Sequence, residues 1–146
     1  MPRRLAFSES ALAGHLAAWR ARLPEVPALR LSDALFATLS PVAAPTGVLA
    51  EIAIPVPVAA AARFVVLLED IQDPGNLGAL LRTAAAAGVE QAYLSTACAD
   101  AWSPKCLRGG QGAHFRLAIQ ERADLPEVAR GFPGVIHAAV LGAEAS

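Results

Sequence analysis

The sequence contains few aromatic residues, few cysteines and no long apolar run. Aromatic residues make up 5% of its 146 residues, and there are two cysteines, Cys98 and Cys106. Two cysteines are too few for a disulfide framework, and their spacing matches no zinc-binding signature, so we expect reduced thiols and no metal site. No apolar run is long enough to cross a membrane, and the first residues lack the uninterrupted apolar core of a signal peptide. We therefore expect a cytoplasmic protein with no membrane partner.

An excess of charge is also missing. The formal net charge is −1, so no overall basic field indicates a nucleic-acid partner, and any nucleic-acid binding has to use local basic groups. What the sequence does have is hydrophobic side chains, which make up 55% of the residues and include many alanines. This composition is sufficient for a core in which helices pack closely against a sheet.

Residues 1–54 are predicted to form one small unit that contains both helices and strands. Residues 55–62 (PVPVAAAA) are the predicted linker, because two prolines separated by one residue disfavour a helix and a central strand. The elements predicted before the linker are a helix over residues 9–22, an extended run over Val26–Leu31, a helix over Asp33–Leu39 capped by Ser32, and a strand over Val48–Ile54.

Residues 63–146 alternate regularly between predicted strands and helices. Such alternation predicts an α/β fold in which helices flank a parallel sheet. The predicted strands are Phe64–Leu68, Ala92–Leu94, His114–Ile119 and Gly134–Leu141, and the predicted helices are Leu77–Ala87, a short helix from Ser103 to Arg108, and Leu125–Arg130. His114 is expected to be a packing residue at the start of its strand, and His137 a core histidine in the last strand.

The loop after the first of these strands is a candidate site, because ligands of parallel sheets bind at the carboxyl ends of the strands. Asn76 is predicted to be the N-cap of the following helix, and Gly78 would let a backbone or a ligand approach closely. Arg82 follows Gly78 by one helical turn, so we expect Asn76, Gly78 and Arg82 to line one edge. The alternative is a capped helix whose arginine is an ordinary surface group.

A second candidate site is the segment SPKCLRGGQGAHF, residues 103–115. Lys105 and Arg108 flank a predicted glycine-rich turn, Gly109–Gly112, whose exposed backbone amides could hold an anion such as a phosphate. The alternative interpretation is a flexible turn ahead of the next strand.

Together the two segments resemble a known family. The pattern Asp73-Pro74-x-Asn76-x-Gly78-x-x-x-Arg82-Thr83-Ala84 is similar to the first motif of the SpoU/TrmH RNA methyltransferases. The pattern Arg108-x-x-x-Gly112-Ala113-x-Phe115 is similar to the second motif, and residues 32–36 and 46–50 resemble the end of the family's small ribosomal-protein-like RNA-binding domain. The resemblance implies part of a SPOUT methyltransferase domain in residues 63–146, preceded by part of an RNA-binding domain in residues 1–54.

The resemblance also implies a function. Members of this family transfer a methyl group from S-adenosylmethionine to a ribose 2′-hydroxyl of tRNA or rRNA, usually as homodimers. The matching motif positions make Arg82 and Asn76 the candidate catalytic residues. Arg108, together with the neighbouring Lys105 and Gly112, is the candidate RNA-binding group.

The family's third region, which builds the cofactor pocket and closes a knot, has no counterpart before Ser146. We therefore expect a chain truncated at both ends, with cofactor-binding residues beyond Ser146 and no activity of its own. Two alternatives stay open: a catalytically inactive fragment that binds RNA or a partner chain, and an unrelated nucleotide-binding α/β protein that uses the helix start at Asn76 for phosphate.

Overall fold

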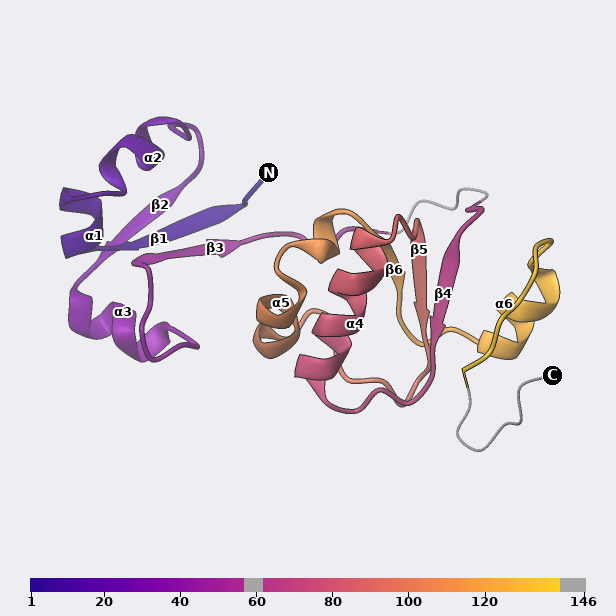
Figure 1. Ribbon diagram of the computed structural model, residues 1–146. Helices are drawn as coiled ribbons and strands as arrows, with labels where there is room; N and C mark the ends of the chain where they lie inside the picture. The colour runs from indigo at the N-terminus through magenta and orange to yellow at the C-terminus, as the bar shows by residue number, and fades with distance from the viewer. Residues whose placement is uncertain (57–61, 140–146) are drawn as a thin grey trace. The chain divides into compact units, whose positions relative to one another are not determined.

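The computed structural model describes residues 1–56 and 62–139 and divides into two compact units, Met1–Ile54 and Pro55–Ser146 (Figure 1). Most of the linker predicted at residues 55–62 lies outside the described residues. No described helix is both long enough and apolar enough to span a bilayer.

The first unit is built on a three-stranded mixed sheet with the order β2-β1-β3. The central strand β1 was not predicted; it runs parallel to β2 and antiparallel to β3. Its side chains Leu5 and Phe7 are buried with Ala11, Leu16 and Val26 in the core of this unit. The elements in chain order are β1 (Arg4–Ser8), α1 (Glu9–Ala13), α2 (Ala17–Ala21), β2 (Ala28–Leu31), α3 (Asp33–Leu39) and β3 (Val48–Glu51).

The single helix predicted over residues 9–22 is wrong, because Gly14 interrupts it. Gly14 ends α1 with a backbone outside the helical region (φ −109°, ψ −122°). The break turns the chain so that Leu16 is buried in the core, whereas Trp19, which the helical spacing placed on the same stripe, is 58% exposed. The helix predicted over Asp33–Leu39 is confirmed, with Ser32 as its N-cap.

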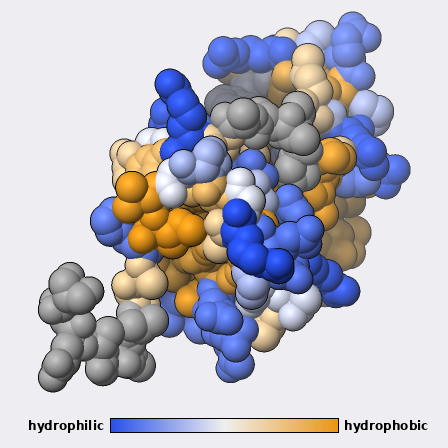
Figure 2. Space-filling view, turned by 90° about the vertical axis from the view of Figure 1, so that its right-hand side faces the viewer, coloured by the Kyte–Doolittle hydropathy of each residue, from blue (hydrophilic) through white to orange (hydrophobic). Residues whose placement is uncertain are grey.

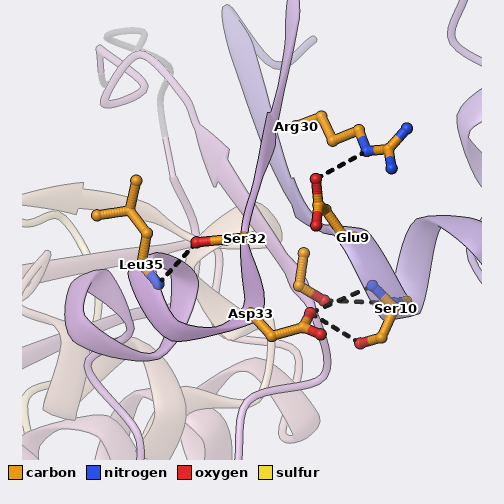
Figure 3. Close-up of polar contacts among 8 residues, drawn as sticks. Glu9, Ser10, Arg30, Ser32, Asp33 and Leu35 are labelled. Carbon is orange, nitrogen blue, oxygen red and sulfur yellow. Dashed lines mark hydrogen bonds and ion pairs between the residues drawn. The ribbon is translucent and has the colours of Figure 1, made fainter.

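Polar side chains join the starts of α1 and α3 (Figure 3). The Asp33 carboxylate accepts hydrogen bonds from the backbone N of Ser10 at 3.2 Å and from its Oγ at 2.8 Å. These hydrogen bonds hold the pKa of Asp33 below its ordinary value. Beside them, Arg30 of β2 pairs with Glu9 at 3.3 Å, so both helix starts are tied to the edge of the sheet.

The second unit is built on a parallel sheet with the order β4-β5-β6, as predicted for an α/β fold with flanking helices. Helices α4 and α5 lie on one side of this sheet and α6 lies on the other (Figure 1). The elements are β4 (Val65–Leu68), α4 (Pro74–Ala86), β5 (Gln91–Leu94), α5 (Pro104–Gly110), the 3-10 helix η1 (Ala113–Phe115), β6 (Ala118–Gln120) and α6 (Leu125–Gly131).

The core of this unit lies between the sheet and the pair α4 and α5, with Leu77, Leu81 and Leu94 fully buried. The two helices touch backbone to backbone at Gly78, where an added Cβ would lie 2.8 Å from the amide nitrogen of Gly110 and closer still to the carbonyl oxygen of Cys106. The close backbone approach expected at Gly78 is therefore confirmed, and the approaching group is α5.

The opposite face of the sheet is covered less completely. A pocket of about 600 Å³ lies between the sheet and α6, and its lining includes Val65, Tyr93 and Gln120 from the three strands. Figure 2 views the molecule from this side and shows hydrophobic surface exposed to solvent. Phe64 just before β4 and Val135 after α6 are 50% and 79% exposed.

Three elements that were predicted in this unit need correction. The strand predicted over His114–Ile119 begins only at Ala118, because the left-handed backbone of Gln111 and Gly112 (φ 48° and 89°) turns the chain into η1 first. Gly109 and Gly110 belong to α5, so the predicted glycine-rich turn is limited to the next two residues. The strand predicted over 134–141 does not form within 134–139, and residues 140–141 lie outside the described residues.

The two histidines of this unit, His114 and His137, lie in different environments. His137 is exposed, contrary to the prediction of a core histidine, because residues 134–139 pair with no described strand. His114 is a packing residue, as predicted: it is 1% exposed, and its Nε2 donates a hydrogen bond to the carbonyl oxygen of Ala101 at 2.7 Å. The Trp102 ring packs edge-on against the imidazole, with the ring centroids 5.3 Å apart.

The burial of His114 predicts a dependence of stability on pH. Burial lowers the pKa of His114 from its ordinary value of 6.5, although the hydrogen bond to Ala101 partly opposes the shift. The unfolded chain therefore binds the proton more readily than the folded one, and the free energy of unfolding should decrease as the pH falls below about 6.5. Urea denaturation of the protein and of His114→Gln between pH 7.5 and 5 measures this contribution. The exposed His15→Gln is the control, and an equal pH dependence in all three proteins would contradict the prediction.

Candidate functional site

The loop between β4 and α4 is held in an unusual backbone conformation. Asp70 has a φ of 54°, in the left-handed region that non-glycine residues adopt infrequently. Its backbone N donates to Ser95 Oγ at 3.0 Å, and Ser95 Oγ donates to Asp70 Oδ1 at 3.0 Å. Ser95 directly follows β5, so the end of one strand fixes the loop that leaves its neighbour.

Cys98 fixes the next part of the same loop. The backbone N of Ile71 donates to Cys98 Sγ at 3.4 Å, and the thiol donates to the carbonyl oxygen of Leu68 at 3.2 Å. The backbone N of Ala99 donates to the carbonyl oxygen of Ile71 at 2.9 Å. Residues 95–99 thus hold the loop from β4 to α4 in place through hydrogen bonds. The sequence patterns did not indicate this role.

The N-cap of α4 is Asp73, which corrects the prediction that Asn76 caps this helix. Asp73 Oδ1 accepts a hydrogen bond from the backbone N of Asn76 at 2.8 Å, and Pro74 occupies the first helical position. An aspartate followed by proline is a strong helix-start signal, and it could have identified the cap from the sequence. Asn76 consequently lies in the first turn, with its side chain exposed.

Lys105 connects this cap to the start of α5. Its Nζ lies 2.6 Å from Asp73 Oδ2 in an ion pair whose side chains are 57% and 45% exposed. The hydrogen bond from Lys105 holds the pKa of Asp73 below its ordinary value. Lys105, predicted as an RNA contact, therefore already has a carboxylate partner.

A pocket of about 530 Å³ opens beside the loop and the first three turns of α4. Its lining combines carboxylate, amide and apolar groups: Asp70, Ile71, Gln72, Asp73, Asn76, Ala79, Leu80 and Thr83. Of the two predicted catalytic residues, the pocket contains Asn76 but not Arg82.

The predicted common edge of Asn76, Gly78 and Arg82 is not formed. Residues of a helix advance by about 100° each, so positions 76 and 82 point about 120° apart, whereas positions 78 and 82 share a face. Gly78 is buried against α5, and Arg82 is exposed one turn farther along that side of α4. Arg82 therefore lies toward α5 and not toward the pocket.

The second predicted group lies at the end of α5. Arg108 and Gly112 are both exposed, and Gln111 Nε2 donates to the carbonyl oxygen of Arg108 at 2.8 Å. Within the described ranges, no carboxylate lies within ion-pair distance of Arg82 or Arg108. Two arginines without acidic partners thus lie on the α4–α5 pair, and both are available to an anionic ligand.

The described residues do not form a fitted cradle for S-adenosylmethionine. The pocket beside α4 is open to solvent, and the one buried side-chain atom without a hydrogen-bond partner in the described chain, Nδ1 of His114, packs against Gly110 rather than facing a cavity. In the same ranges no group of three or more His, Cys, Asp or Glu residues could hold a metal ion.

Comparison with known proteins assigns this arrangement to a family. Residues 63–145 match the model of the SpoU rRNA Methylase family. The chain belongs to this family. It is 39% identical over 92 residues to 23S rRNA (guanosine(2553)-2′-O)-methyltransferase RlmP of Bacillus subtilis, which covers 63% of this chain and 37% of that protein. It is 50% identical over 56 residues to human mitochondrial rRNA methyltransferase 3, which covers 38% of this chain and 13% of that protein.

Solved structures of SpoU-type proteins share the fold. A putative RNA methyltransferase of the TrmH family from Porphyromonas gingivalis superimposes with a TM-score of 0.62 at 28% identity, over 82% of this chain and 47% of that one. The SpoU methyltransferase AviRb from Streptomyces viridochromogenes, in complex with the cofactor AdoMet, gives a TM-score of 0.72 at 24% identity, over 89% and 51%. The chain spans about half of these structures and a smaller part of the curated relatives.

Because Ser95 and Asp70 are joined by hydrogen bonds, we expect the effects of substituting them on the free energy of unfolding to be non-additive. Ser95→Ala removes the partner of the Asp70 backbone N–H and should lower the free energy of unfolding by about 1 kcal/mol. Asp70→Gly should cost less in the Ser95→Ala background than in the wild type, because glycine adopts a positive φ without steric strain and the hydrogen bond is already lost. Urea denaturation of the four proteins of this cycle measures the coupling, and strictly additive effects would show that the two residues act independently.

Proposed function

We propose that the chain acts in RNA ribose 2′-O-methylation, with S-adenosylmethionine as the methyl donor and tRNA or rRNA as the substrate. The observation that carries the proposal is the family match over residues 63–145, together with relatives named as rRNA methyltransferases. The arginines on α4 and α5, which have no acidic partner among the described residues, support it, because they offer cationic contacts to RNA phosphates in a chain with a net charge of −1.

Arg82 is proposed to bind and orient the substrate. An arginine keeps its proton in proteins, so it is poorly suited to remove the proton of the 2′-hydroxyl. A fixed guanidinium can instead hold the ribose or its phosphate and stabilise the negative charge that develops on the oxygen, while water or a phosphate accepts the proton. Asn76, whose side chain lines the pocket beside α4, can donate or accept a hydrogen bond with a part of the substrate that enters this pocket.

Arg108 and the open backbone at Gly112 are the proposed phosphate contacts, with Lys105 in a secondary role because Asp73 already pairs with it. An added Cβ at Gly112 would meet no atom within 4 Å, so a ligand could approach the backbone there. Assembly as a homodimer and a cytoplasmic location belong to the proposal through the family resemblance alone.

Removing the Arg82 guanidinium tests the proposed role directly. In a methyl-incorporation assay, Arg82→Ala should lower kcat by roughly 100-fold or more, because charge stabilisation in the transition state is lost. Arg82→Lys should recover part of the rate, since it keeps a cation. Arg130→Ala, on α6 across the sheet, is the control. Wild-type kcat in Arg82→Ala would exclude this role.

The salt dependence of RNA binding tests the phosphate contacts. Arg108→Gln should flatten the plot of log Kobs against log salt concentration by about one unit, as expected when one phosphate contact is lost. Lys105→Gln should flatten it less, because the ion pair with Asp73 already neutralises much of its charge. Equal flattening by both substitutions would show that RNA displaces Asp73 from Lys105.

A second candidate function is RNA binding without catalysis, which the lack of a fitted cofactor cradle in the described residues favours. Isothermal titration of the chain with S-adenosylmethionine separates the two functions. Binding in the micromolar range would support an enzyme site within the chain. RNA binding with no detectable cofactor binding would favour the binding function for this chain.

A further inference from the structure

Phe115 is held on the surface by a short hydrogen-bonded turn. Its side chain is 65% exposed, although the two preceding residues of η1, Ala113 and His114, are buried. The backbone N of Phe115 donates to the carbonyl oxygen of Gly112 at 3.1 Å, and the backbone N of Arg116 donates to that of Ala113 at 2.8 Å. The buried imidazole anchors the turn, so the ring that follows it is presented to solvent in a defined place.

The charge around this ring distinguishes it from the isolated apolar residues that are common on protein surfaces. Arg116 is the next residue and Arg108 lies seven positions earlier, and both are exposed. Neither has an ion-pair partner in the part of the chain that the structure describes. No aspartate or glutamate occurs between Ser103 and Gln120, so the segment carries only positive charge.

An exposed aromatic ring in a segment with exposed arginines complements a single-stranded nucleic acid. Every base offers a face that can stack on a phenyl ring, while the guanidinium groups bind the phosphates on either side. Paired RNA is a poorer match, because its bases are stacked inside an A-form helix and are not available to the ring. An apolar protein partner would leave the two cations unpaired.

We propose that Phe115 stacks on an unpaired RNA base while Arg108 and Arg116 bind the neighbouring phosphates. The inference rests on the proposed action on RNA and deepens it, because it names an unpaired nucleotide as the feature that this surface recognises. It also adds Phe115 and Arg116 to the group formed by Arg108 and Gly112.

The test measures binding of the chain to a fluorescently labelled 12-nucleotide single-stranded RNA and to a 12-base-pair RNA duplex by anisotropy. Phe115→Ala should weaken single-strand binding on the order of 10-fold, with no change in its salt dependence, because stacking releases no counterions. Phe115→Trp should restore the affinity. Phe64→Ala removes another exposed phenylalanine, outside this segment, and is the matched control.

Arg116→Gln should instead reduce the slope of log Kobs against log salt concentration by about one unit, as expected when one phosphate contact is lost. Circular dichroism of each variant checks that the fold is retained. Equal losses with Phe115→Ala and Phe64→Ala, or equal losses for single strand and duplex, would overturn the proposal.

Two further outcomes would separate a failure of the stacking inference from a failure of the proposed action on RNA. RNA binding by the wild type that does not depend on Phe115 would overturn the stacking inference alone, whereas no RNA binding by the wild type would remove the RNA partner and this inference together. If Phe115→Ala instead dissociates a dimer in sedimentation and leaves RNA affinity unchanged, the ring is a contact between copies of the chain, and the proposal is wrong.

Discussion

Helices α4 and α5 meet without an intervening side chain, and the positions of the candidate residues in the second unit depend on this contact. Gly78 allows it: any side chain there would collide with the backbone of Cys106 and Gly110. The contact brings the start of α5 to the start of α4, where Lys105 pairs with Asp73. Arg82, one turn after Gly78 on the same side of α4, consequently lies toward α5 and away from the pocket beside the loop.

The loop after β4 shows how the sheet controls this arrangement. Parallel neighbours end at the same edge, so residues that follow β5 can bind the segment that leaves β4. Ser95 and Cys98 do so, and they stabilise a left-handed Asp70 that would otherwise be strained. The position of the Asp73 cap, and with it the first residue of α4, follows from this support.

The surface of the second unit explains how a chain with a net charge of −1 can still offer an RNA-binding region. Its positive charge is concentrated locally, in an acid-free segment that includes α5, η1 and β6, and not spread over the molecule. The short turn η1 buries His114 and exposes Phe115, so the same three residues contribute to the core and to the surface that we propose for RNA. The other face of the sheet, toward α6, differs from this positively charged segment because it exposes hydrophobic residues such as Phe64 and Val135.

Elements whose signals are local could be predicted from the amino-acid sequence. Caps and spacing predicted the helix Asp33–Leu39, alternation of strands and helices predicted the parallel sheet, and two short motifs were enough to indicate the family. Features that depend on contacts between residues distant in the chain became visible only in the folded structure. It alone showed β1 as a central strand, the ion pair between Lys105 and Asp73, and the contact of α4 with α5 at Gly78. The physical reason is that helix and turn preferences act over a few residues, whereas strand pairing and side-chain partners depend on which distant parts of the chain pack together.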